Sequence, residues 1–101
     1  MSEAALKDFG AFPEPVQRQM IAALRMAAGG EKTETAKPMK GFGSGIFEIA
    51  LRYRGDAFRA IYAVQTDEDV WVLHTFQKKA SAGIKTPKRE IELIRERIKR
   101  V

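Results

Sequence analysis

The most regular hydrophobic pattern of the chain lies between residues 45 and 79. In the first part of this stretch, apolar and polar side chains alternate with a period of two, which predicts a β-strand. One face of the strand is expected to be buried, and the other to be solvated and mostly basic. The apolar set is Phe47, Ile49, Leu51 and Tyr53, and the polar set is Glu48, Arg52 and Arg54.

Two further strands are predicted to follow in an antiparallel meander. Residues 54–56 read Arg-Gly-Asp, a turn signal in which glycine supplies the positive φ of a tight reversal, and a second strand is expected over residues 57–66. Residues 66–69 form a second polar turn. Residues 70–76 are β-branched and aromatic, which predicts a strand covered on both faces.

Helical patterns flank the meander. A short helix is expected over residues 2–9 with Ser2 as its N-cap, and it should stop near Gly10. A longer amphipathic helix follows Pro13 and ends at the glycine pair 29–30, so the two helices form a hairpin. Residues 31–45 have no periodicity and are predicted to be a connecting loop.

A last helix is expected near the C-terminus. Thr86 is its predicted N-cap and Pro87 its first residue, and Ile91, Ile94 and Ile98 form an apolar stripe that should pack on the sheet. Most of the charges on this helix are interpreted as a solvated face. Together these elements predict one domain over residues 1–101, of α+β class, with an N-terminal helical hairpin packed on a small antiparallel β-meander and a C-terminal helix.

Composition limits the possible functions. The chain has 18 Lys and Arg against 13 Asp and Glu, a net charge of +5, which favours a polyanionic partner such as RNA or DNA. There is no cysteine and one histidine, so neither a metal site nor a cofactor is expected. With no signal-peptide pattern and no long apolar run, a soluble, cytoplasmic protein is expected.

Several motifs, taken together, carry a family resemblance. They are Leu51-Arg52, Phe58-Arg59-Ala60-Ile61-Tyr62, Leu73-His74-Thr75-Phe76-Gln77-Lys78-Lys79 and Thr86-Pro87-Lys88-Arg89-Glu90-Ile91. With the order of the predicted elements, they make nearly the whole chain resemble the phage-derived HigB-like toxins of the RelE/ParE superfamily. The resemblance implies a RelE/ParE-like fold.

The resemblance also implies a function. RelE and HigB members are toxins of type II toxin–antitoxin pairs that cut mRNA in the ribosomal A site without a metal. The implied partners are an antitoxin encoded nearby, typically with a helix-turn-helix, and the ribosome with its mRNA; no membrane and no small-molecule cofactor are involved. A ParE-like toxin directed at gyrase and an inactive module that only binds the antitoxin are the alternatives.

This chain departs from the family pattern in two places. Such toxins usually begin with a strand before the helical hairpin, whereas the predicted helix starts at once here. The sheet edge is then missing, lost to a wrongly assigned start codon, or replaced by a partner. The two lysines of the RelE active strand correspond to Glu48 and Ala50 in this chain. Any chemistry would then fall to the remaining basic residues and the histidine.

The catalytic candidates are four residues, Arg59, Arg52, His74 and Lys78. Arg59 is expected to stabilise the phosphate, because a guanidinium presents two parallel donors; the alternative is an ion pair with Asp56 or Glu48. Arg52 is a similar but weaker candidate, because arginines at strand ends are often merely solvated. Histidine is the residue type suited to proton transfer at neutral pH, so His74 is either the proton-transfer group or a hydrogen-bonded core residue.

The remaining candidates are lysines and a turn arginine that would hold the RNA backbone. Lys78 is expected at the catalytic site, and Arg54 and Lys79 are expected to bind RNA. The alternative for the two lysines is a solvated basic turn.

Overall fold

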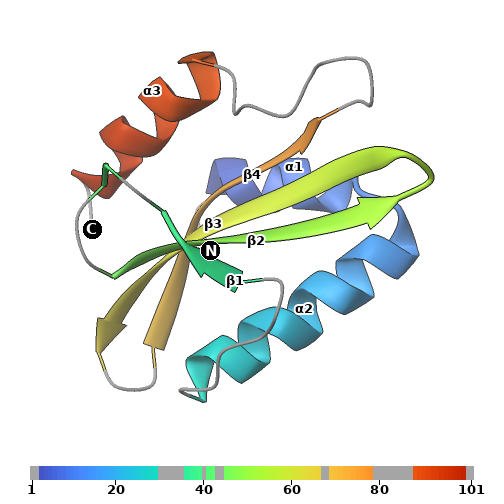
Figure 1. Ribbon diagram of the computed structural model, residues 1–101, viewed down its shortest axis with the longest axis horizontal. Helices are drawn as coiled ribbons and strands as arrows, with labels where there is room; N and C mark the ends of the chain where they lie inside the picture. Colours follow the sequence, from blue (N-terminus) through green and yellow to red (C-terminus); the bar gives the residue numbers. More distant parts are fainter. Residues whose placement is uncertain are drawn as a thin grey trace.

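The computed structural model describes residues 3–29, 36–39, 41–42, 45–66, 69–78 and 88–99. The elements, in chain order, are α1 (Glu3–Gly10), α2 (Glu14–Ala28), β1 (Ala36–Pro38), β2 (Ile46–Tyr53), β3 (Asp56–Thr66), β4 (Asp69–Lys78) and α3 (Lys88–Ile98) (Figure 1). The strands form one antiparallel sheet in the order β1-β2-β3-β4. The predicted α+β class is confirmed, and the architecture is compatible with a RelE-like fold. No helix in these ranges is long and apolar enough to cross a membrane.

The predicted helical hairpin is present. Pro13 precedes α2 and Pro15 lies in its first turn, where the missing N–H of proline costs no helical hydrogen bond. The N–H of Gly29 donates to the carbonyl of Arg25 at 3.1 Å and ends the helix. Gln17 Nε2 donates to the carbonyl of Phe12 at 2.8 Å, which ties α2 to the short link from α1. Three predicted terminal residues, Ser2, Thr86 and Pro87, lie outside the described ranges.

A two-residue turn joins β2 to β3. Tyr53 pairs with Asp56, and the two residues between them, Arg54 and Gly55, have φ values of 51° and 86°. Two successive positive φ values are typical of the type I′ turns that match the twist of a hairpin. The prediction that Arg54 shares the basic face of the strand is therefore wrong: it is exposed in the turn, with its guanidinium carbon 5.2 Å from the centroid of the Tyr53 ring.

The prediction that residues 31–45 form a loop without structure is also wrong in part. Residues 36–38 form β1, which pairs with β2 at the edge of the sheet, and the N–H of Met39 donates to the carbonyl of Ile46 at 2.9 Å. An edge strand tolerates Pro38, because one side of the strand needs no partner.

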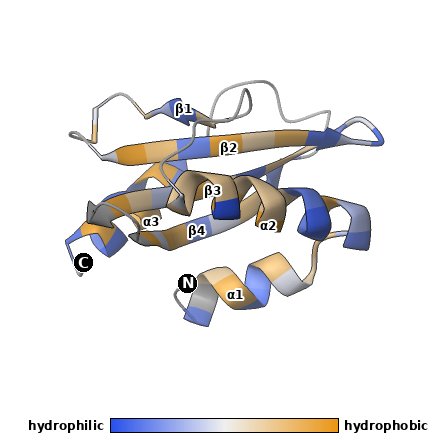
Figure 2. Ribbon diagram, turned by 90° about the horizontal axis from the view of Figure 1, so that it is seen from below, coloured by the Kyte–Doolittle hydropathy of each residue, from blue (hydrophilic) through white to orange (hydrophobic). Residues whose placement is uncertain are grey.

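Helices cover the sheet on both faces. On one face, α2 packs on the alternating apolar residues of β2 and β3, which Figure 2 shows as orange segments between blue ones along β2, while α1 packs on β4. The buried residues of this core include Phe9, Phe12, Val16, Met20, Leu24, Ile49, Leu51, Phe58, Tyr62 and Val72. Thr75 of β4 also faces this side, and its hydroxyl donates to the carbonyl of Ala5 at 2.7 Å.

The opposite face carries a second, smaller core under α3. Ile94 of α3 is buried there with residues of β2, β3 and β4, namely Ile46, Ile61, Ala63, Leu73 and Phe76. The prediction that this face is solvated and mostly basic is thus wrong for the part that α3 covers. The rest of the face remains polar.

Candidate functional site

The polar candidates are gathered by the strand register on one face of the sheet, here called the α3 face. Antiparallel pairing brings residues on neighbouring strands directly opposite each other, and their side chains then share a face. Three successive rows cross the strands. They are Lys37, Glu48, Ile61 and His74; then Ala50, Arg59 and Phe76; then Arg52, Ala57 and Lys78.

Three of these residues form a basic cluster: Arg52, Arg59 and Lys78. They come from three different strands and lie around Ala50 and Ala57, whose methyl groups leave no bulky side chain between them. Arg52 is exposed, Arg59 is half-buried and Lys78 is buried. Three cations on a rigid sheet can bind the oxygens of a phosphodiester group from several sides.

Glu48 positions Arg59 within the cluster. The Nη1 atom of Arg59 lies 3.2 Å from one carboxylate oxygen of Glu48 and 3.4 Å from the other, and the two side chains are 17% and 20% exposed. The ion pair foreseen as the alternative for Arg59 is therefore present. It restrains the guanidinium on the α3 face of the sheet, and an incoming phosphate would compete with the Glu48 carboxylate.

Lys78 is the most unusual cation of the cluster, because it is only 4% exposed. Burial lowers its pKa below the ordinary value for lysine, the Arg59 charge lowers the pKa further, and Glu48 opposes both effects. A lysine with a lowered pKa gives up its proton more readily and can take part in proton transfer.

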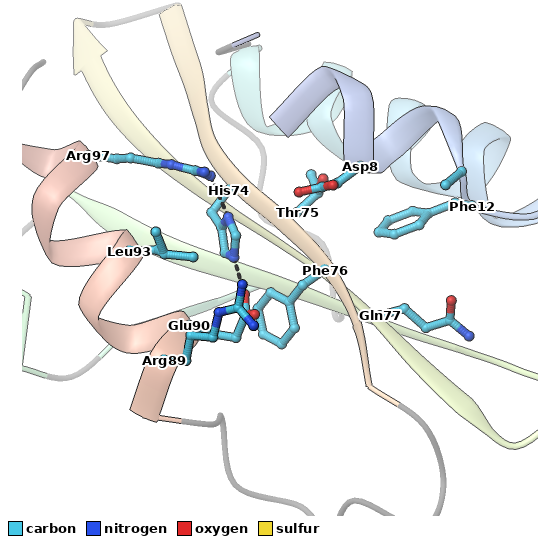
Figure 3. A pocket seen from close by; sticks show the side chains of 11 residues that line it. Asp8, Phe12, His74, Thr75, Phe76, Gln77, Arg89, Glu90, Leu93 and Arg97 are labelled. Carbon is cyan, nitrogen blue, oxygen red and sulfur yellow. Dashed lines mark hydrogen bonds and ion pairs between the residues drawn. The ribbon is translucent and has the colours of Figure 1, made fainter. Parts of the chain in front are cut away.

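His74 lies in a separate hydrogen-bonded group near the middle of β4. The ring is 2% exposed, with Nε2 against a carboxylate oxygen of Glu90 and Nδ1 against Nη1 of Arg97 (Figure 3). A guanidinium can only donate, so Nδ1 accepts from Arg97, and Nε2 carries the proton that points to Glu90. The same Nη1 also donates to the carbonyl of Leu73 at 3.0 Å.

This group ties α3 to the sheet. Both ring nitrogens of His74 are engaged by α3, and the ring stacks on Phe76 with centroids 5.4 Å apart. The geometry matches the interpretation of His74 as a hydrogen-bonded core residue, while its role in proton transfer stays a prediction.

The remaining candidates do not join the cluster. Arg54 lies in the turn beyond the end of β2, and Lys79 is outside the described ranges. The interpretation of most charges of the last helix as a solvated face does not hold for Arg97, which binds His74 together with Glu90. Their spacing around Ile94, four residues before it and three after, is the signal that places them on the buried side of α3.

Metal binding finds no support in the described ranges. No three His, Asp or Glu residues of those ranges are grouped so that they could hold an ion.

Comparison with known proteins gives one match. The family model described as phage derived protein Gp49-like (DUF891) matches residues 7–99, which run from α1 to just past α3 and include the basic cluster and His74. Neither a curated protein nor a solved structure matches the chain.

Replacing Glu48 by Gln is expected to lower the pKa of Lys78 further, because the carboxylate raises that pKa and Arg59 would then act on Lys78 unopposed. The titration is followed by NMR of the ¹⁵N-labelled lysine side chain. Glu92→Gln, an exposed change on α3, is the control and should leave the Lys78 pKa where it is. An unchanged or higher Lys78 pKa in Glu48→Gln would contradict the assigned geometry.

Replacing Glu90 by Ala is expected to destabilise the protein by about 1–3 kcal/mol, since the buried Nε2–H of His74 loses its acceptor. The free energy of unfolding is measured by urea denaturation. Glu92→Ala, an exposed change on the same helix, serves as the control for helix propensity. Equal losses in the two variants would show that the contact between Glu90 and His74 does not hold α3 on the sheet.

Proposed function

Since the chain belongs to the phage-derived Gp49-like family, we propose that it is the toxin of a type II toxin–antitoxin pair and cuts mRNA on the ribosome. The observation that supports this proposal best is the basic cluster, in which cations of three strands lie side by side on one face of the sheet. The HigB-like resemblance of the sequence supplies the reaction.

The proposed reaction is attack of a ribose 2′-oxygen on the neighbouring phosphorus. The 2′-oxygen–phosphorus bond forms, the bond from phosphorus to the 5′-oxygen breaks, one proton leaves the 2′-hydroxyl and one reaches the 5′-oxygen. Arg59 stabilises the added negative charge on the phosphate, because the Glu48 carboxylate and its strand hold it in place. Arg52, exposed at the end of β2, holds the RNA backbone.

Lys78 is a candidate for proton transfer as well as for phosphate binding. Its lowered pKa and its place beside Arg59 favour it, whereas both ring nitrogens of His74 are already bound to α3. His74 would act only after its contact with Glu90 or Arg97 opens. The lysines of the RelE active strand are replaced here by Glu48 and Ala50 of β2. Lys78 would then supply the amine from a different strand, β4.

The ribosome and an antitoxin are the proposed partners. With few acid–base groups of its own, the protein relies on the ribosome to hold the mRNA in line for attack, and such positioning supplies up to about 7–11 kcal/mol of the barrier. The antitoxin covers the basic cluster with an acidic or amphipathic segment, because complementary charge speeds and orients association.

Arg59→Ala is expected to slow mRNA cleavage about 10²- to 10³-fold, since one well-placed cation of the transition state is removed. Cleavage is measured by primer extension on mRNA from cells that express each variant, with growth arrest as the second readout. Lys88→Ala, an exposed change at the start of α3, is the control and should cut like the parent. Both variants should remain folded and bind the antitoxin.

Three outcomes would argue against this proposal. If Arg59→Ala cuts mRNA at the parent rate, Arg59 does not stabilise the transition state. Gyrase-linked DNA damage without mRNA cuts would support the ParE-like alternative. Absence of growth arrest by the parent, together with antitoxin binding, would support an inactive binding module.

A further inference from the structure

Two opposite charges line a cavity that the proposed cleavage does not use. The cavity measures about 480 Å³, within the range of about 300–1,000 Å³ that is typical of small-molecule sites. Asp8 of α1 and Arg89 of α3 line it, and β4 passes between them (Figure 3). Both residues are exposed, whereas residues 74–76 of β4 are buried. A ligand would therefore meet the charged side chains of the walls and not the backbone of the strand.

Neither charge stabilises the helix that carries it. Asp8 lies in the last turn of α1, where the negative end of the helix dipole disfavours a carboxylate. Arg89 lies in the first turn of α3, where the positive end disfavours a cation. Within the part of the chain that the structure describes, neither side chain has a hydrogen-bond or ion-pair partner. Unpaired charges that work against their own helices and face one cavity indicate a functional site.

The cavity adjoins the basic cluster. Phe76 lines the cavity and pairs with Arg59, and Gln77 lines it one residue before Lys78. An RNA phosphate at the basic cluster would therefore bring a neighbouring nucleotide to the edge of the cavity. Proteins that bind single-stranded RNA commonly take up unstacked bases and form hydrogen bonds to their edges.

We propose that this cavity binds one base of the RNA and that the base is guanine. Guanine presents two adjacent donors, N1–H and the N2 amino group, which suit the Asp8 carboxylate. Its O6 and N7 atoms are acceptors, which suit the Arg89 guanidinium. The other three bases lack two adjacent donors. The inference rests on the proposed function, since the basic cluster must hold RNA for a base to reach the cavity.

The remaining walls suit a flat ring. Phe12 of α1 and Leu93 of α3 line the same cavity and offer apolar contacts to the faces of a purine. A free amino acid also combines a donor with an acceptor, but one carbon atom joins its two charged groups. Because β4 separates Asp8 from Arg89, the longer guanine ring is the better match.

The first test compares guanosine 5′-monophosphate with adenosine 5′-monophosphate, which carry the same phosphate. Calorimetric titration of the full chain is expected to show about tenfold tighter binding of the guanosine nucleotide, the effect of one bidentate contact. In NMR spectra, this nucleotide should shift the signals of Asp8 and Arg89. Equal affinity for the two nucleotides would overturn the proposal. Shifts confined to Arg52, Arg59 and Lys78 would also overturn it, because the protein would then bind the phosphate alone.

Asp8→Asn tests the donor edge of the base. The carboxamide keeps the shape of the side chain but offers one acceptor instead of two, so the preference for the guanosine nucleotide should fall toward one while binding of the adenosine nucleotide is retained. The change removes a charge that the helix dipole opposes, so the free energy of unfolding should not decrease. Glu3→Gln is the control, because Glu3 is exposed on the same helix and does not line the cavity.

Arg89→Gln tests the acceptor edge. Loss of the guanidinium is expected to weaken binding of the guanosine nucleotide about tenfold, since O6 and N7 lose their common donor. Lys88→Gln is the control, because it removes the same charge from the neighbouring exposed position, which does not line the cavity. An unchanged preference in both Asp8→Asn and Arg89→Gln would overturn the proposal, and so would equal effects of each variant and its control.

These binding measurements do not depend on cleavage. If the parent protein prefers the guanosine nucleotide but cuts no mRNA, the guanine site is supported and the proposed function is contradicted. If the parent protein cuts mRNA but binds the two nucleotides equally, the guanine site is contradicted and the proposed function is not.

Discussion

The register of β2 against β3 is the constraint on which the site depends, and the two-residue turn at Arg54 and Gly55 fixes it. A type I′ turn leaves one pairing for the strands that it joins, here Tyr53 with Asp56. A slip by one residue would move every side chain to the other face. Arg59 would then face the core under α1 and α2, where its charge would have to be buried without the Glu48 carboxylate.

The α3 face is divided between a closed part and an open part. Ile94 covers the apolar end of the face, and the bonds of His74 to Glu90 and Arg97 hold α3 in place there. Burial of an imidazole is acceptable because both of its nitrogens find partners. The same face therefore serves as core at the end under α3 and carries the basic cluster at the other end.

Much of this arrangement could be predicted from the sequence, because it follows from local patterns. Alternation in β2 identified the buried face, the Arg-Gly pair located the turn, and the proline and glycine signals bounded α2. The pairing of Arg59 with Glu48 was among the predicted alternatives, since both lie on one face of a hairpin.

The errors concern features that depend on distant partners. The strand β1 has three residues, too few for a pattern of alternation, and exists because β2 offers it an edge. Arg54 follows the period of β2 but lies beyond its end, where the turn redirects the chain. The spacing of Glu90 and Arg97 around Ile94 places them on the buried side of α3. Their hydrogen-bond partner, His74, becomes evident only from the packing of α3 on β4.

The central claim is that strand register turns three separate cations, Arg52, Arg59 and Lys78, into one surface for RNA. The most direct measurement is an NMR titration of the ¹⁵N-labelled protein with a short single-stranded RNA whose 2′-O-methyl groups block cleavage. The account predicts that the side-chain signals of these three residues shift together, with the same midpoint, while those of Arg18 and Arg25 on α2 stay in place. Shifts confined to α2, or midpoints that differ among the three residues, would contradict it.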